Sequence, residues 1–308
     1  MEAIIAPIDR NLLEQELTDD IFVRNTHFGN NKIYIFSHND SPHLMQEVGR
    51  LREVSFRAAK GGTGKSVDID SYDTAEEPFK QLIVWNPENR DIIGGYRFIR
   101  GEHLKVIAKD EVHSPTSRLF SFTEKFISDY LPISIELGRS FVQPDYQPSN
   151  NVRKGMYSLD NIWDGLGAII VDNPDIKYLF GKITMYPHFD TLAKELIMRF
   201  MHKYFPDPDN LLTPRKPLQL SISTDLLDSI LTGNTYEKDY KILTQKVRAQ
   251  GENIPPLFSA YMNLTSTMKV FGTAVNEHFG DVEETGIIVT NADIHENKKI
   301  RHISSYKK

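Results

Sequence analysis

Three charged side chains lie in segments whose pattern otherwise predicts β-strands. Arg97 stands within GGYRFIR, and Glu136 and Arg139 stand within ISIELGRSFV. Because strand side chains alternate between two faces, Glu136 and Gly138 share one face, and Arg139 returns to the other unless Gly138 forms a β-bulge. A bulge re-aims side chains and is common beside active sites. The spacing therefore indicates an α+β domain with a polar cleft in its sheet.

The same charges also have a structural explanation, and the residue pattern leaves both interpretations open. Asp70 and Asp73 come from the loop before the strand hairpin 80–100, and Arg52 lies on the helix before that loop. Charged groups that are partly buried in a sheet need partners. Glu136 and Asp73 could therefore do no more than neutralise the two strand arginines.

A second stretch, AAKGGTGKS, fits a relaxed phosphate-binding P-loop through Ala59, Gly64, Lys65 and Ser66. A working P-loop lies between a buried strand and a helix, whose N-terminal amides hold the phosphates. Here the apolar periodicity predicts a helix over 42–58 before the motif, and an acidic, turn-rich loop follows it. We therefore reject a nucleotide site and expect a mobile Gly-rich connector that could close over a ligand.

Composition narrows the function classes. The 308 residues include 40% hydrophobic and 25% charged residues, carry a net charge of −6 and contain no Cys. The lack of Cys excludes disulfides and thiolate chemistry, and segment 68–79 lacks the Gly and the closing Glu of a calcium loop, so we expect no metal site. The negative charge argues against nucleic acid as a partner. The first residues lack a secretory pattern and no apolar run is long enough to span a bilayer, so we expect a cytoplasmic protein.

The order of the expected elements indicates an α+β fold, with helices flanking one mixed, mostly antiparallel central sheet. Strands are expected at 32–37, 80–86, 92–101, 131–146, 176–186 and 285–294, and helices at 42–58, 154–174, 190–206, 236–251 and 254–272. The expected organisation is an N-terminal extension over 1–30, a single domain over 31–295 with a helical insertion at about 206–272, and a basic tail over 296–308. We expect the tail to be a solvated end, with docking to an acidic protein or an anionic membrane as the alternative.

Three blocks in this order carry a resemblance to a known family: RLREVSFRAA, DIDSYDTAEEPFKQLIVWNPENRDIIGGYRFIRG and ISIELGRSFVQPDYQ. They resemble the hemolysin-like branch of the GNAT superfamily, which includes ornithine-lipid N-acyltransferases and bacterial glycine N-acyltransferases. The resemblance covers about 30–295 and implies a GNAT-like fold. The more distant acyl-homoserine lactone synthases have a similar pattern, matched here by Arg52, Phe56, Asp70, Asp73, Arg97, Glu136 and Arg139.

The resemblance implies transfer of a (3-hydroxy)fatty acyl group from acyl carrier protein to the α-amine of an amino acid such as ornithine or glycine. The amine must lose a proton, so Glu136 is expected as general base, with Arg97 or Arg139 holding the acceptor's carboxylate. A backbone N–H freed near the bulge could stabilise the oxyanion. The expected catalytic residues are Glu136, Arg139 and Arg97, and the expected substrate-binding residues are Arg52, Phe56, Asp70, Asp73 and Ser140.

The expected donor is an acyl-phosphopantetheine thioester, with no permanently bound cofactor. Superfamily members that use acetyl-CoA bind its pyrophosphate with a Q/R-x-x-G-x-G/A turn, which is replaced here by QPDYQPSNNVRKG, so acyl carrier protein is favoured over CoA. The pairs Arg153-Lys154 and Arg215-Lys216 could steer an acidic carrier. Candidate residues to line the acyl channel are Phe56, Trp85, Phe98, Leu179 and Phe180.

An alternative function belongs to a different class. The protein could be catalytically inactive and serve as a GNAT-like binding or membrane-associated module. The basic tail motivates this alternative, and it also suggests a peripheral contact with the inner membrane for an active enzyme.

Overall fold

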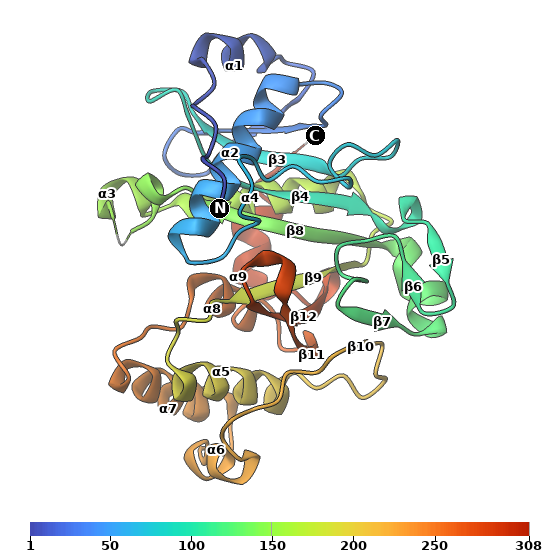
Figure 1. Cartoon of the computed structure of the whole chain (residues 1–308), viewed down its shortest axis with the longest axis vertical. Coiled ribbons are helices and arrows are strands. Elements are labelled where there is room, and N and C mark those ends of the chain that lie inside the picture. Colours follow the sequence, from blue (N-terminus) through green and yellow to red (C-terminus); the bar gives the residue numbers. More distant parts are fainter. Residues whose placement is uncertain (149, 308) are drawn as a thin grey trace.

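An eight-stranded sheet forms the centre of the computed structural model, which describes residues 1–148 and 150–307 (Figure 1). Every neighbouring pair of strands is antiparallel except β8 and β9, which run parallel. In order across the sheet, the strands are β1 (Phe22–Asn25), β2 (Lys32–Phe36), β3 (Lys80–Asn86), β4 (Asp91–Arg100), β8 (Ser134–Val142), β9 (Tyr178–Met185), β12 (Val282–Thr290) and β11 (Lys269–Asn276). The predicted α+β class is confirmed.

Helix α2 (Pro42–Ala58) covers one face of the sheet, together with α1 (Arg10–Glu16). Proline at its first turn fits an N-terminus, and Leu44, Val48 and Leu51 recur on the face that is buried against the sheet. Each such apolar side chain contributes roughly 1.5–3 kcal/mol when fully buried. The helix has the bounds predicted from the sequence, and it places its C-terminal residues beside β8.

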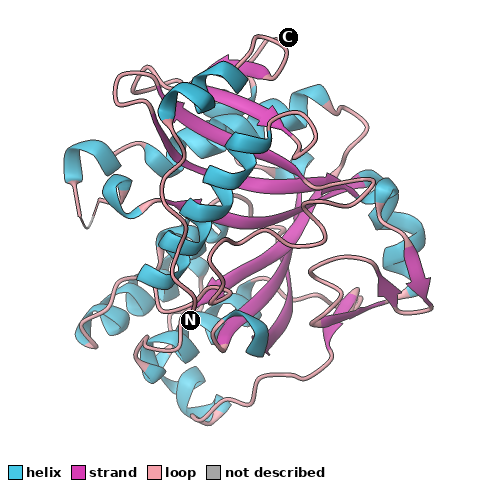
Figure 2. Cartoon of the chain, turned by 45° about the horizontal axis from the view of Figure 1, so that its top comes forward, coloured by secondary structure: helices cyan, strands magenta, loops and turns pink. Residues whose placement is uncertain are grey.

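The opposite face is covered by a layer of helices (Figure 2). These are α4 (Ser158–Asp172), α5 (Thr191–Tyr204), α6 (Thr224–Ile230), α7 (Tyr236–Ala249) and α8 (Pro256–Met262), with the short α3 (Val152–Gly155) before them. Ile162 and Leu166 of α4 join the core that also contains Leu82 of β3 and Ile135 of β8. None of the helices in the described part of the chain has the length and apolar character that crossing a membrane requires.

The segment 101–133, between β4 and β8, folds over the same sheet face as α2. It contains β5 (Val106–Ala108), β6 (Glu111–Val112), β7 (Phe120–Phe122) and a helical turn at Phe126–Tyr130, and β7 pairs with β10 (Leu212–Pro214). Phe122 and Phe126 pack edge-on against Phe180 of β9. This packing fixes the loop around Thr116 above the middle of the sheet.

Some of the predicted elements are partly wrong. The segment 254–272 was expected to be helical, but α8 ends at Met262 and Lys269 begins β11. The second half of the segment instead pairs with β12, an edge contact that the local pattern could not reveal. The long strand expected over 131–146 is shortened to β8, with single helical turns on both sides.

The Gly-rich connector is anchored and does not resemble a P-loop. The buried Glu53 carboxylate accepts hydrogen bonds from the Thr63 amide (3.1 Å), the Thr63 hydroxyl (2.7 Å) and the Gly64 amide (2.8 Å). Amides that could have held a phosphate are therefore occupied by a carboxylate. The rejection of a nucleotide site is supported, whereas the expectation of a mobile connector is not.

The basic tail also differs from the expectation of a solvated end. Residues 296–306 pack along α4, where buried His302 contacts Asp164 through Nδ1 at 2.8 Å and Arg301 contacts Asp160 at 2.6 Å. Gly167 allows this close approach, since a Cβ there would lie 2.1 Å from the carbonyl oxygen of His302. Residues 296–306 are thus part of the folded domain.

Candidate active site

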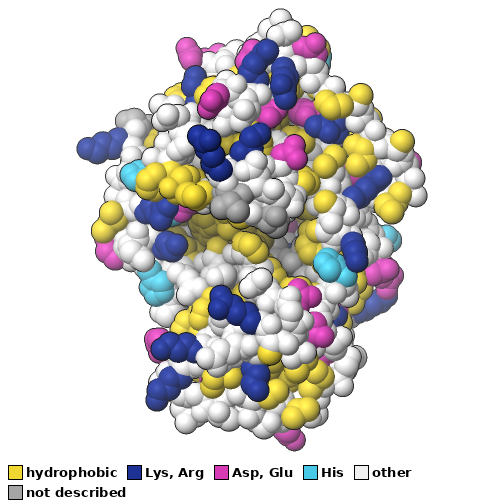
Figure 3. All heavy atoms as spheres, turned by 90° about the vertical axis from the view of Figure 1, so that its left-hand side faces the viewer, with side chains coloured by type: hydrophobic (Ala, Val, Ile, Leu, Met, Phe, Trp, Pro, Cys, Tyr) yellow, Lys and Arg dark blue, Asp and Glu magenta, His cyan; other side chains and the backbone are white. Residues whose placement is uncertain are grey.

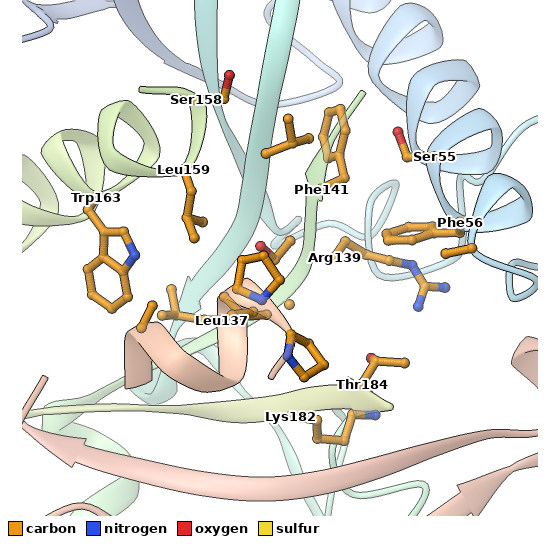
Figure 4. A pocket seen from close by; sticks show the side chains of 18 of the residues that line it. Ser55, Phe56, Leu137, Arg139, Phe141, Ser158, Leu159, Trp163, Lys182 and Thr184 are labelled. Carbon is orange, nitrogen blue, oxygen red and sulfur yellow. The ribbon is translucent and has the colours of Figure 1, made fainter. Parts of the chain in front are cut away.

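The parallel strands β8 and β9 separate halfway along their length. They pair only from Ser134 with Tyr178 to Leu137 with Gly181, although β8 continues to Val142 and β9 to Met185. A cavity of about 730 Å³ occupies the resulting wedge. Figure 3 shows a hollow with hydrophobic side chains in its depth, and Figure 4 shows residues of both strands around the cavity.

The cavity has an apolar and a polar part. Trp163 and Leu159 of α4 lie on one side of the cavity (Figure 4). Leu257 and Ala260 of α8 also line it. The polar part lies on the sheet face that α2 and the segment 101–133 cover, and its lining residues include Arg97, Thr116, Glu136, Gly138, Arg139, Lys182, Thr184 and Glu284. A long apolar chain and a small polar molecule could therefore meet at the point where the strands part.

Glu136 is a buried carboxylate with one occupied oxygen. Its Oε1 accepts hydrogen bonds from the Thr116 amide (3.0 Å) and the Thr116 hydroxyl (2.6 Å). Its Oε2 has no hydrogen-bond partner among the described residues, although the side chain is 1% exposed and lines the cavity. Burial raises the pKa of Glu136, and the Thr116 hydrogen bonds and the nearby Lys182 ammonium offset part of that rise.

Arg52 is fully buried behind the cavity wall and joins two aspartates. Its Nε lies 3.2 Å from Asp68 Oδ2, and its Nη2 lies 2.9 Å from Asp73 Oδ2. Burial alone would raise the pKa of Asp73, but Arg52 and Arg97 outweigh it and hold that pKa well below its usual range. Burial would also raise the pKa of Asp68, but Arg139 and Arg52 outweigh it, so that this pKa is lowered.

Arg97 and Arg139 extend this network to the cavity. Arg97 Nη1 donates to Asp70 (2.9 Å) and to Asp73 (3.1 Å), whereas Arg139 Nε lies 2.8 Å from Asp68. Three arginines therefore face three aspartates, and their formal charges cancel. This balance explains how so many charges are accommodated next to a hydrophobic core.

The bulge anticipated at Gly138 is present, but the strained residue is its neighbour. Gly95 pairs with Phe141 and Arg97 pairs with Gly138, so β8 carries one extra residue. Arg139 adopts the left-handed backbone region with φ 50°, which is uncommon for a long side chain. Its guanidinium then lies 4.2 Å from the centre of the Phe279 ring.

The structure places the expected site residues in two groups. Glu136, Arg97, Arg139, Phe56 and Ser140 line the cavity. The other expected residues do not line the cavity: Asp70 and Asp73 contact Arg97, and Arg52 contacts Asp73 behind them.

The purely structural interpretation is right for Asp73 and wrong for Glu136. Asp73 does pair with Arg97, but Arg139 is paired with Asp68, and the carboxylate of Glu136 contacts Thr116. Of the residues expected to line an acyl channel, Trp85, Phe98, Leu179 and Phe180 lie in the hydrophobic core, and Phe56 alone lines the cavity.

Sequence reasoning missed Asp68, Thr116, Lys182 and Glu284. Lys182 gave a signal, because it interrupts the apolar run YLFGKITM of β9. Thr116 lies in an irregular loop, and nothing local indicates that it contacts Glu136.

Within residues 1–148 and 150–307, no group of His, Asp or Glu side chains is arranged to hold a metal ion.

Comparison with known proteins is consistent with this geometry. Residues 51–155 match the family model described as acetyltransferase (GNAT) domain. A protein of Phocaeicola vulgatus named glycine N(alpha)-acyltransferase is 48% identical over 308 residues, covering all of this chain and 94% of that protein. A protein of the same name from Bacteroides thetaiotaomicron is 50% identical over 99% of this chain and 91% of that protein.

Likeness to solved structures is more remote. The acyl-homoserine lactone synthase LasI matches 91% of this chain and 96% of its own, with 11% identity and a TM-score of 0.42. The CoA-dependent acyl-homoserine lactone synthase BjaI covers 88% of each chain, with 12% identity and a TM-score of 0.38. These values do not help to identify the family of this chain.

The two relatives and the family model do identify it. The chain belongs to the GNAT family of acyltransferases that contains these two relatives, and it is an N-acyltransferase.

Proposed function

We propose that this enzyme transfers a fatty acyl group from a carrier thioester to the α-amine of a small amino acid, with glycine as the first acceptor to test. The names of the two relatives support glycine, and ornithine is the second acceptor. The observation that carries the proposal is the free Oε2 of Glu136 in a cavity that also has an apolar part. A buried acceptor atom without a partner is costly, and an amine N–H would satisfy it.

In the proposed reaction, Glu136 takes a proton from the acceptor ammonium, directly or through water. The neutral amine then attacks the thioester carbon, and the C–S bond breaks as the amide forms, releasing the carrier thiol. A base of this kind typically contributes about 10²–10⁴ in rate. We propose a backbone N–H at the Arg139 bulge as the donor to the oxyanion, and one such donor typically contributes about 3 kcal/mol.

Arg97 and Arg139 remain candidate catalytic residues, with a narrower role than the sequence suggested. Asp68 engages both Nε and Nη2 of Arg139, so this guanidinium is not free to bind a carboxylate bidentately. Arg97 contacts Asp70 and Asp73 through Nη1, and its Nε has no hydrogen-bond partner among the described residues. We propose that their positive charge stabilises the developing oxyanion. Asp70 and Asp73 would act by holding Arg97, Arg52 by holding Asp68 and Asp73, and Phe56 and Ser140 by shaping the cavity.

The donor would enter on the apolar side, where each buried methylene of its chain contributes about 0.8 kcal/mol. Lys298 lines the cavity there, and Arg153 and Lys154 directly precede the lining residues Gly155 and Met156. Acyl carrier proteins are acidic, so this charge supports such a carrier as donor. The absence of a Gly-rich pyrophosphate turn in QPDYQPSNNVRKG supports the same donor over CoA.

We further propose a cytoplasmic enzyme with a peripheral contact at the inner membrane. The product, an N-acyl amino acid, is amphiphilic and must reach a lipid surface. Met156 lines the cavity, and Ile300 lies between the lining residues Lys298 and His302 in the chain; they are 57% and 60% exposed, with basic residues beside them in both segments. Cosedimentation with anionic vesicles, compared with neutral vesicles, tests this contact.

The function is tested by offering the purified protein acyl carrier protein and CoA thioesters of the same chain, each with a panel of amino acids. We expect release of carrier thiol and a product with the mass of N-acylglycine. Failure to acylate any amino acid from either donor would overturn the proposal. A preference for the CoA thioester would overturn only the choice of carrier.

A further inference from the structure

Four charged residues on adjacent strands form a polar stripe across one face of the sheet. They are Arg97 (β4), Glu136 (β8), Lys182 (β9) and Glu284 (β12), and all four line the cavity. The strand register places them on one face, because Arg97 pairs with Gly138, Glu136 with Phe180 and Lys182 with Gly286. Positive and negative charges thus alternate along the stripe, an arrangement that complements a zwitterion.

Gly138 forms a gap in this stripe between the two cations. Arg97 lies opposite it on β4, and Lys182 follows the last paired residue of β9 on its other side. A Cβ at residue 138 would meet only the Arg97 side chain, at 3.6 Å from Nε and 3.8 Å from Cγ. Because residue 138 has no side chain, none packs against the Nε–H of Arg97 from this position.

Both cations retain a hydrogen-bond donor. Arg97 Nε is buried and has no hydrogen-bond partner in the described part of the chain. Lys182 Nζ lies 2.7 Å from Glu284 Oε2 and donates to the Pro115 carbonyl at 2.9 Å. An ammonium has three N–H groups, so two known contacts leave Lys182 a third donor.

We propose that the acceptor's carboxylate binds above Gly138, between Arg97 Nε and Lys182 Nζ, which places its α-amine next to Glu136. This assignment rests on the proposed function and adds the residues that recognise the amino acid. Lys182 is the principal binding residue, because its ammonium is held in place by Glu284 and Pro115. The free Oε2 of Glu136 then receives the amine, and the apolar wedge is left to the donor.

The test compares glycine with glycinamide, which has the same amine but no carboxylate. In the wild type we expect kcat/KM to favour glycine strongly. Lys182→Met should reduce the glycine-to-glycinamide ratio by about 10- to 100-fold, the range for losing a hydrogen bond to a charged group. The KM of the acyl donor should stay unchanged, and Lys182→Arg should restore part of the ratio.

Lys194 offers a matched control. It pairs with Glu283, the neighbour of Glu284 on β12, at similar burial, and it does not line the cavity. Lys194→Met therefore removes an equivalent ion pair and should leave the acceptor ratio at the wild-type value. Any general loss of stability would appear in both variants as a lower melting temperature.

Gly138→Ala gives a second measurement on the opposite wall, because the methyl group would cover Arg97 Nε at ordinary contact distance. It should also lower the ratio of kcat/KM for glycine to kcat/KM for glycinamide. If Lys182→Met does not fold, Gly138→Ala alone tests the proposal. The proposal is overturned if both variants slow the two acceptors equally. It is also overturned if the donor KM rises instead. A wild-type protein that acylates no amine would instead refute the proposed function itself.

Discussion

Thr116 gives both its amide and its hydroxyl hydrogen to one oxygen of Glu136 and leaves the other oxygen without a partner. The two residues come from different parts of the fold, since Thr116 lies in the segment over the sheet and Glu136 on the central strand. The contact fixes the orientation of the carboxylate. The oxygen without a partner is Oε2, and Glu136 lines the cavity.

Glu136→Gln should lower kcat by about 10²–10⁴, the usual contribution of a general base, while keeping the shape and the Thr116 contacts of the side chain. Because burial raises the pKa of Glu136 in the folded state, its contribution to stability is present below the unfolded pKa and is lost as the pH rises through the folded pKa. The variant should therefore be at least as stable as the wild type at neutral pH. Steady-state kinetics and thermal melting check both points, and a variant with full activity would exclude Glu136 as the base.

Thr116→Val should shift the pH dependence of the reaction. The Thr116 hydrogen bonds lower the pKa of Glu136, so removal of the hydroxyl donor raises it. A base must be ionised, and the acidic limb of kcat/KM should move to higher pH, with the rate at high pH largely retained. A pH profile that does not move would show that another group controls this limb. Thr265→Val, a substitution at another buried threonine outside the cavity lining, provides the control.

Arg52→Met should destabilise the fold more than any substitution in the cavity. It leaves Asp68 and Asp73 with one cation fewer, and removal of one partner from a buried ion pair typically costs about 3–5 kcal/mol. Urea unfolding at neutral pH measures this loss. Arg10→Met, which removes an exposed pair with Asp91, is the matched control and should have little effect. Equal stability of the two variants would contradict a central role for the buried network.

The lowered pKa values of Asp68 and Asp73 predict a defined acid sensitivity. Burial opposes their ionisation, but the neighbouring arginines outweigh it, so both carboxylates contribute stability above the unfolded pKa. That stability is lost as the pH falls through the folded pKa values. Unfolding free energy should therefore decline below about pH 4, near the unfolded pKa of an aspartate. A variant with Asp73→Asn should show a shallower decline, and an unchanged slope would refute the assignment.

Local pattern was sufficient for the elements that frame the site. The periodicity of α2 and the alternation along β8 predicted the helix and the face of Glu136, because both depend on neighbours in the chain. The break in the alternation of side chains at Gly138 and Arg139 likewise indicated the bulge. The family resemblance, carried by the same blocks, named the acyltransferase class.

Contacts between distant segments could not be predicted in this way. Lys182 and Glu284 lie about a hundred residues apart, and their pairing depends on the register of β9 with β12. The tail gave the opposite error: its basic residues suggested a solvated end, but Asp160 and Asp164 on α4 bind Arg301 and His302. Composition indicates which charges are present, whereas the fold decides which of them are paired.

Ala260→Phe should change the preference for acyl-chain length. Ala260 of α8 lines the apolar part of the cavity, together with Leu257 and Trp163. A ring at this position would displace the end of a long chain, and each methylene that loses its burial costs about 0.8 kcal/mol. We expect kcat/KM to fall steeply for long acyl donors and little for short ones, with the glycine KM unchanged. If long and short donors lost activity equally, the acyl chain would have to lie elsewhere.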